Sequence, residues 1–118
     1  MRKPLTLLAL AAVALAPASA LAHAHVVSST PAANAAVAAP KQVSVTFNEK
    51  LVPAFSKLEI SMAGMAMKVP VKTSLSADGK TLTGVPQAAL MKGNYVIDWS
   101  AASADGHKTK GSIAFKIK

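Results

Sequence analysis

The sequence predicts an all-β domain, an antiparallel sandwich or barrel, from two observations. Apolar and polar residues alternate with a period of two in several short runs, as at Val43, Val45 and Phe47, which is the pattern of strands with one buried face. Turn signals separate these runs at intervals: Thr30-Pro31, Ala39-Pro40, Val52-Pro53, Asp78-Gly79, Val85-Pro86, Lys92-Gly93-Asn94 and Asp105-Gly106. Short strands punctuated in this way are typical of antiparallel sandwiches and barrels.

Three further runs share the alternation and complete the predicted core: Leu58, Ile60 and Met62; Tyr95, Ile97 and Trp99; and Ile113, Phe115 and Ile117. We expect Trp99, the only tryptophan, at the centre of the core. Residues 87–92 are predicted to form a short helical turn. The pattern indicates no long amphipathic helix and no internal repeat.

The first 22 residues have the character of an export signal peptide. Arg2 and Lys3 give a positive start, and residues 5–16 are apolar apart from one Thr. This run is shorter than the roughly 20 residues of a membrane-spanning helix, so an uncleaved anchor is the weaker interpretation. Small residues allow cleavage at three positions: after Ala20, after Ala22 or after Ala24.

Composition limits what the mature chain can be. Removing residues 1–22 leaves 96 residues, enough for one domain, residues 23–118. This part keeps 11 Lys and no Arg against 5 acidic residues, a net charge of about +6. The lysines are spread along the chain, which favours a soluble exported domain over a nucleic-acid interface. Because there is no Cys, disulfides and thiolate metal sites are excluded.

All three histidines fall in two short clusters, His23-Ala24-His25 and Asp105-Gly106-His107. Cleavage after Ala22 would give His23 a free amine beside its imidazole. An amine, two imidazoles and a carboxylate form a Cu(II) ligand set, because this ion prefers tetragonal nitrogen and oxygen coordination. The hypothesis requires the start of the first strand to lie beside a hairpin tip that contains Asp105 and His107.

His25 leaves a second Cu(II) chelate open. As the third residue after a cut at Ala22, it could join the amine and two ionised backbone amides in a square-planar site that needs neither Asp105 nor His107. We predict that Cu(II) binds at the folded site in preference to this chelate, because the folded site does not require ionised backbone amides. His25 is otherwise an additional or outer ligand, or simply an exposed strand residue.

Met62, Met65 and Met67 form a second candidate site in the run S-M-A-G-M-A-M. Thioethers are soft ligands that select Cu(I). We hypothesise a weak or transient Cu(I) site from Met65 and Met67 with help from Met62. A structural role competes, since Met62 also fits the core alternation of its strand.

Four stretches of the mature chain resemble the CopC family of periplasmic copper-binding and copper-resistance proteins: His23 with V-S-S-T-P-A (Val27 to Ala32), V-x-F-N-E-K-L-V (Val45 to Val52), G-N-Y-V-I-D-W (Gly93 to Trp99) and A-S-A-D-G-H-x-x-x-G (Ala102 to Gly111). The resemblance implies a Greek-key β-sandwich, cupredoxin-like or immunoglobulin-like. It also implies Cu(II) ligation by the amine and imidazole of His23, by Asp105 and by His107, which favours cleavage after Ala22. Some relatives carry a longer methionine-rich loop that binds Cu(I), whereas the loop here is shorter and no histidine follows it.

The sequence therefore predicts a periplasmic carrier or buffer that holds Cu(II), limits its toxicity and passes it on, and not an enzyme. The resemblance implies an inner-membrane CopD-type partner, and we expect a monomer. A competing interpretation is a copper-dependent oxidative enzyme with a histidine-brace site; a third is an adhesion sandwich without metal. The sequence has no G-x-S-x-G elbow, phosphate loop or zinc spacing.

Overall fold

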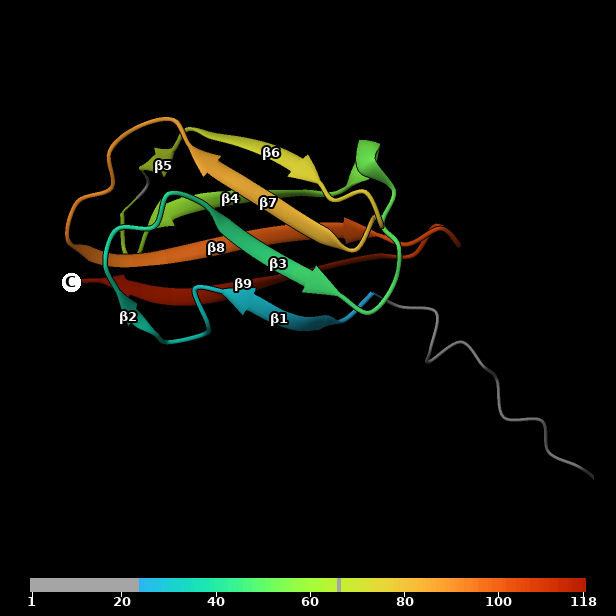
Figure 1. The fold of residues 1–118 in the computed structure, drawn as a ribbon, viewed down its shortest axis with the longest axis horizontal. Coiled ribbons are helices and arrows are strands. Elements are labelled where there is room, and N and C mark those ends of the chain that lie inside the picture. The colour runs from blue at the N-terminus through green and yellow to red at the C-terminus, as the bar shows by residue number, and fades with distance from the viewer. Residues whose placement is uncertain (1–23, 66) are drawn as a thin grey trace, which may run out of the picture.

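The computed structural model describes residues 24–65 and 67–118, which form two packed β-sheets (Figure 1). The first sheet has the order β1-β3-β7-β6, made of β1 (Val26–Thr30), β3 (Val43–Phe47), β6 (Val71–Leu75) and β7 (Thr81–Pro86). The second has the order β2-β9-β8-β4-β5, made of β2 (Ala36–Val37), β4 (Lys57–Met62), β5 (Lys68–Val69), β8 (Gly93–Ala102) and β9 (Lys108–Ile117).

The topology is that of an immunoglobulin-like sandwich. Neighbouring strands are antiparallel, except that β2 runs parallel to β9. The chain passes to the second sheet for the short strand β2 and returns for β3. It crosses again between β3 and β4, between β5 and β6, and between β7 and β8. The order β1-β3-β7-β6 against β9-β8-β4 matches the two-sheet pattern of immunoglobulin domains. The predicted all-β fold is confirmed.

The core lies between the two sheets and is built from the alternating residues. Val43, Val45 and Phe47 are buried on β3, while their polar neighbours are only half-buried. Tyr95 and Phe115 stack across β8 and β9 with ring centroids 5.6 Å apart. Burial of such large apolar side chains is the main stabilising contribution to a domain of this size.

Trp99 does not occupy the centre of the core, so that prediction was wrong. Its indole is only partly buried and packs edge-on against Phe47, with ring centroids 5.0 Å apart. Trp99 pairs with Gly111 across β8 and β9, and a Cβ at Gly111 would lie 2.6 Å from the indole. The large ring fits there because Gly111 has no side chain, and Tyr95 and Ile97 fill the centre.

The predicted helical turn at residues 87–92 was also wrong, because this segment is an irregular loop between β7 and β8. Two hydrogen bonds hold it: Gln87 N–H donates to Pro70 O (2.7 Å), and the Tyr95 hydroxyl donates to Met91 O (2.7 Å). Within residues 24–65 and 67–118 the helical structure is the 3₁₀ turn Pro53–Phe55. No helix in this part of the chain has the length and apolar character to cross a membrane.

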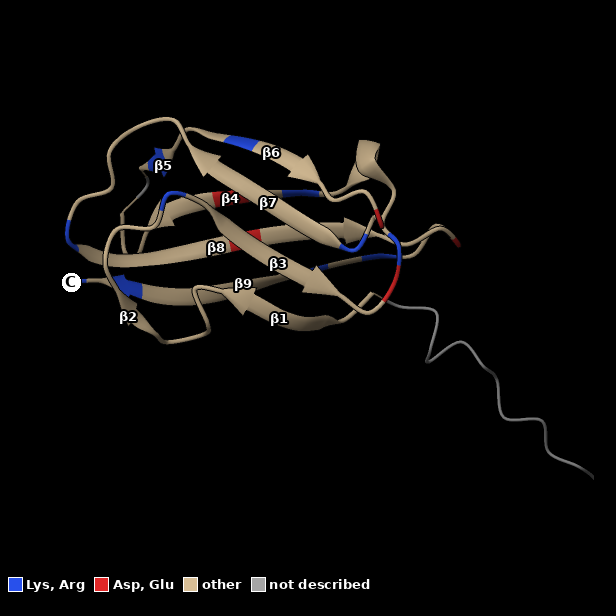
Figure 2. Cartoon of the chain, viewed as in Figure 1, with Lys and Arg blue, Asp and Glu red and all other residues tan. Residues whose placement is uncertain are grey.

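The two ends of the sandwich carry different residues, and we call them the histidine end and the methionine end. The histidine end carries residues 24–25 and the loops 48–56, 76–80 and 103–107. The methionine end carries residues 63–65 and 67, the loop 87–92 and Lys118. Figure 2 shows acidic residues together with lysines in the loops of the histidine end, and acidic residues along β4 and β8, whereas the methionine end carries lysines.

Candidate metal centre

The hairpin between β8 and β9 forms a tight turn at residues 103–107. Ser103 N–H donates to His107 O (3.0 Å), and Gly106 N–H donates to Ser103 O (2.9 Å). Gly106 adopts a φ of +90°, a left-handed conformation that glycine accepts without strain. The base of the hairpin is pinned to the loop 48–56, since Val52 N–H donates to Ala102 O (2.8 Å). The turn is therefore held at a fixed place on the histidine end.

The structure brings Asp105 and His107 together within this turn. Oδ2 of Asp105 lies 2.7 Å from Nδ1 of His107, and Oδ1 of Asp105 accepts the His107 backbone N–H at 3.1 Å. The Ser103 hydroxyl also donates to Oδ1, and Ser103 itself is buried (1% exposed). The carboxylate consequently fixes the orientation of the imidazole, as carboxylates beside metal-binding histidines do.

These hydrogen bonds lower the pKa of Asp105 well below its ordinary value. The Ser103 hydroxyl is the largest cause, followed by the His107 side chain and then the His107 backbone N–H. All three favour the charged form of the carboxyl group. Asp105 is thus an anion across the physiological pH range.

The start of the described chain lies beside this hairpin. Ala24 is buried (2% exposed), and its carbonyl oxygen accepts a hydrogen bond from the Thr109 hydroxyl at 3.2 Å. Thr109 is two residues after His107, at the beginning of β9. His23, the predicted chelating terminus, lies outside the described residues. Its neighbour Ala24 is nevertheless close to the turn that carries the other two predicted ligands.

His25 is exposed and lies just before β1, and its backbone is tied to the loop that follows β3. His25 N–H donates to Oδ1 of Asn48 (2.7 Å), and Asn48 N–H donates to His25 O (3.0 Å). This reciprocal pair engages the backbone amide that the alternative square-planar chelate would have to ionise. Among the residues that the structure describes, no group of three His, Asp or Glu side chains is gathered for a metal.

A second turn at the histidine end repeats the first four residues of the turn at 103–107 and three of its hydrogen bonds. Residues 76–79 are Ser-Ala-Asp-Gly, as are residues 103–106. The Ser76 hydroxyl donates to Asp78 Oδ1, Lys80 N–H donates to the same oxygen (3.1 Å), and Gly79 N–H donates to Ser76 O (2.9 Å). The pKa of Asp78 is lowered, chiefly by the Ser76 hydroxyl. Lys80 stands where the other turn has a histidine.

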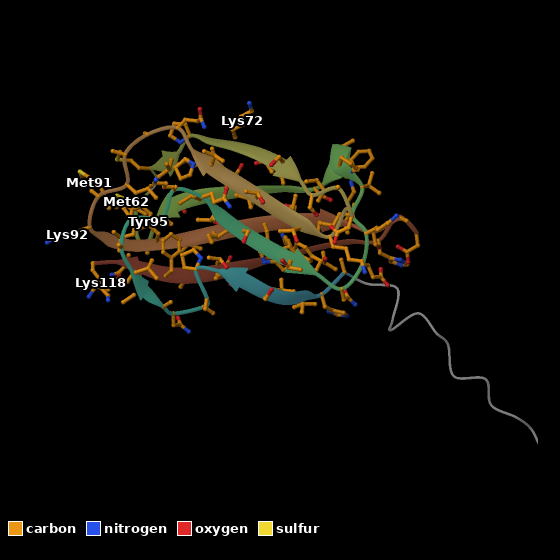
Figure 3. The ribbon with its side chains drawn as sticks, in the orientation of Figure 1. Met62, Lys72, Met91, Lys92, Tyr95 and Lys118 are labelled. Atoms are coloured by element: carbon orange, nitrogen blue, oxygen red, sulfur yellow. The ribbon has the colours of Figure 1, made fainter. Side chains whose placement is uncertain are left out.

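The predicted methionine cluster lies at the opposite end of the sandwich. Met62 and Met67 line a cavity of about 240 Å³, while Met65 is exposed beside it (54%) and does not line it. Met62 N–H donates to Met67 O (3.3 Å), so the backbone brings these two residues together. Figure 3 shows Met62 with Met91 and Tyr95 at this end.

Three residues important at the two ends were not singled out in the sequence. Met91 lines the same cavity as Met62 and Met67, although it is far from them in sequence and on another loop. Ser103 holds Asp105, and Asn48 fixes the backbone of His25. Ser103 could have been found from its spacing of two before an Asp-Gly turn, which is a common side-chain-capped turn. Met91 carries no such signal.

The fold and these two ends define a class: a small β-sandwich with an Asp-His pair beside its first residues and thioethers at the far end. Carboxylate, imidazole and thioether groups are ligand types used for copper. Comparison with known proteins identifies the family. Residues 26–118 match the model of the CopC domain, and the chain belongs to the CopC family.

Similar proteins cover nearly the whole chain. Copper resistance protein C of Xanthomonas campestris pv. juglandis is 42% identical, with 96% of this chain and 94% of that protein aligned. The crystal structure of PcoC, a methionine-rich copper resistance protein from Escherichia coli, has a TM-score of 0.76 and 38% identity, covering 82% of this chain and all of that one. CopC from Methylosinus trichosporium OB3b has a TM-score of 0.73 and 30% identity, covering 81% of this chain and 94% of that one.

Family membership confirms two of the sequence predictions. The chain is a CopC-family protein with a β-sandwich fold, and this is not a family of enzymes.

Proposed function

We propose that the mature protein is a periplasmic Cu(II) carrier or buffer whose site consists of the His23 amine and imidazole, Asp105 and His107. One observation carries the proposal: Ala24 is hydrogen-bonded to Thr109, two residues from His107. Ala24, the residue bonded to His23 in the sequence, therefore lies next to the strand that follows the Asp105-His107 turn. The paired carboxylate and imidazole supply charge compensation and a neutral nitrogen, which suit Cu(II).

The proposal depends on export and cleavage. Residues 1–22 act as the signal peptide, and cleavage after Ala22 makes His23 the first residue of a domain that runs to residue 118. The family resemblance supports this cut over the cuts after Ala20 and Ala24. Residues 1–23 lie outside the described part of the chain, so this step rests on the sequence.

The contacts of His25 support the folded site over the square-planar chelate. That chelate needs the backbone nitrogens of Ala24 and His25 to lose their protons and turn toward the metal. His25 N–H is committed to Asn48, and Ala24 is buried with its carbonyl held by Thr109. Forming the chelate would break the hydrogen bond from His25 N–H to Asn48, whereas the folded site leaves it in place. His25 then remains an outer or non-ligating residue.

Intact-mass spectrometry of the exported protein, with and without one equivalent of Cu(II), tests both the terminus and the stoichiometry. The expected result is a chain that begins at His23 and binds one Cu(II). A chain that begins at Leu21 would contradict the proposal, because His23 would then have no free amine.

Spectral titration of two matched histidine variants separates the two chelates. His107→Ala should change the Cu(II) spectrum and weaken binding, while His25→Ala should leave the spectrum nearly unchanged. The reverse result would indicate the square-planar chelate, whose affinity should also rise steeply with pH because it needs ionised amides. Copper-dependent peroxide consumption on a polysaccharide would instead favour the oxidative enzyme.

A weaker Cu(I) site at the methionine end is the second candidate function. Met62, Met65 and Met67 remain the proposed ligands, and the cavity adds Met91 to the thioethers within reach. Substituting leucine for each methionine keeps the volume similar and removes the sulfur. Cu(I) affinity should fall most for the three cavity methionines and least for Met65→Leu; unchanged affinity in all four variants would remove the site.

The carrier is proposed to act as a monomer and to exchange copper with an inner-membrane CopD-type protein. This partner is proposed from the family resemblance. Gel filtration of the mature protein tests the monomer, and copper transfer to membranes with and without the partner tests the exchange.

A further inference from the structure

The methionine end exposes large apolar side chains beside an apolar cavity. Met67 and Met91 are 62% and 69% exposed, and they border a cavity whose wall also includes Val69, Pro70 and Ala88. Clustered exposure of large apolar side chains is uncommon on a monomer and marks a surface that another molecule covers. Methionine is well suited to such a surface because its flexible thioether adapts to different partners.

The size of the cavity fits a side chain. At about 240 Å³ it holds roughly eight times the ~30 Å³ that one water occupies in the liquid, yet it is smaller than the ~300–1,000 Å³ of typical cofactor pockets. Its floor is firm, because Tyr95 is buried, stacks on Phe115, and donates its hydroxyl to Met91 O. A firm concave apolar site suits a single inserted apolar side chain.

The charge around this cavity is positive. Lys68 lines it and Lys92 follows Met91, and Figure 3 shows Lys118 at the same end. Lys68 pairs with Glu59 (3.0 Å), whereas Lys92 and Lys118 have no ion pair among the residues that the structure describes. A second copy of the chain would bring these lysines against one another, which disfavours self-association through this face.

We infer that the methionine end is a docking surface for a partner protein that inserts a large apolar side chain into the cavity and sets carboxylates against Lys92 and its neighbouring lysines. The occupant is an exposed protein segment with an apolar centre and acidic flanks. A protruding side chain matches the concave shape, which the smooth surface of a bilayer does not. The surface is remote from the Asp105-His107 turn, so the inference does not depend on the proposed Cu(II) site.

A synthetic peptide tests the inference on the copper-free mature protein. The probe has a central Leu-Phe pair with two aspartates on each side and blocked ends. In ¹⁵N-edited NMR titrations, the amide signals of Val69, Met91 and Tyr95 should shift and saturate with a dissociation constant of about 1 mM or tighter. Two control peptides, one with lysines for the aspartates and one with serines for Leu-Phe, should bind at least about tenfold more weakly.

Variants on the protein side locate the site. Met91→Ser and Lys92→Glu should each weaken binding of the acidic peptide several-fold, and added salt should weaken binding to the native protein. Phe55→Ser removes an apolar side chain of similar exposure (59%) from the histidine end and should leave peptide affinity unchanged. Cu(II) binding by Met91→Ser, which should be unchanged, shows that the fold and the other end are intact.

Four results would overturn the inference. The first is no saturable shift with the acidic peptide, and the second is equal binding of the lysine peptide. The third is co-sedimentation with phosphatidylglycerol vesicles that Met91→Ser abolishes, since it would assign the face to a membrane. The fourth is a concentration-dependent dimer that the same variant dissolves, since it would assign the face to a second copy.

Discussion

Two turns at the histidine end have the same first four residues and share three hydrogen bonds, but only one of them carries proposed metal ligands. The turns at 76–80 and 103–107 both place a serine hydroxyl and a backbone N–H on Oδ1 of the aspartate. They differ in the fifth residue, Lys80 or His107. They also differ in their neighbours: Gly79 O accepts Leu51 N–H, whereas the strand that follows His107 contacts Ala24.

The two turns show that the stability of such a turn and its proposed copper binding have different causes. An Asp-Gly turn capped by a serine needs no metal to be stable, because its polar groups are satisfied within the turn. The copper binding proposed at 103–107 is therefore attributed to two additions: an imidazole in the fifth position and the nearby start of the chain. Each addition can be removed or transplanted separately.

Exchanging the fifth residues should give the largest effect. His107→Lys makes the turn at 103–107 a copy of the turn at 76–80. Cu(II) affinity should fall by about 100-fold or more, beyond the loss of an outer-shell partner. The far-ultraviolet circular dichroism and thermal midpoint should change little, since Lys80 already occupies this position in an equivalent turn. Competitive titration with a Cu(II) chelator of known affinity measures the change.

The reciprocal variant Lys80→His is the control for that experiment. It creates a second Asp-Gly-His turn without a chain terminus beside it, so the protein should still bind one Cu(II) with high affinity. A second equivalent bound as tightly as the first would contradict the role given to the chain start.

Sequence patterns predicted the strands with continuous alternation and the location of Asp105 and His107 in a hairpin turn. The prediction that Trp99 lies at the centre of the core was wrong. The alternation shows which face of a strand a residue occupies, but not how close that residue lies to the edge of the core. The helical turn at 87–92 failed because six residues form a stable helix only with tertiary support, and Tyr95 and Pro70 bind this segment as a loop. The role of Met91 depends on a loop folding against a distant strand, which no local pattern encodes.

Replacing the turn glycines should give an intermediate effect that is equal in the two turns. Gly79 and Gly106 have φ values of +74° and +90°, and a Cβ at either would meet no atom closer than 3.5 Å. Gly79→Ala and Gly106→Ala should therefore each lower the free energy of unfolding by about 1–2 kcal/mol through backbone strain alone. Urea denaturation measures both.

Gly64→Ala at the methionine end, with a φ of +76° and open space, is the matched reference and should cost a similar amount. The three variants should differ in Cu(II) affinity although they lose similar stability. Only Gly106→Ala alters the turn that carries proposed ligands, so only this variant should bind Cu(II) more weakly. An equal loss of Cu(II) affinity in Gly79→Ala would show that the effect is general loosening of the histidine end.

The smallest expected difference lies in the acid titration of the two aspartates in the copper-free protein. Both pKa values are lowered from 3.8, and Asp105 more than Asp78, because Asp105 also binds the His107 ring. A lowered pKa means that the folded protein holds its protons less tightly than the unfolded chain, so each carboxylate adds stability above about pH 4 that is lost as the pH falls through the folded pKa. Carboxyl-carbon NMR should show Asp78 titrating first on acidification. Ser103→Ala should raise the pKa of Asp105 and Ser76→Ala that of Asp78, each without moving the other. If Asp105 titrates first, or if one serine substitution shifts both aspartates, the two turns are not the independent, equivalent units on which the comparison rests.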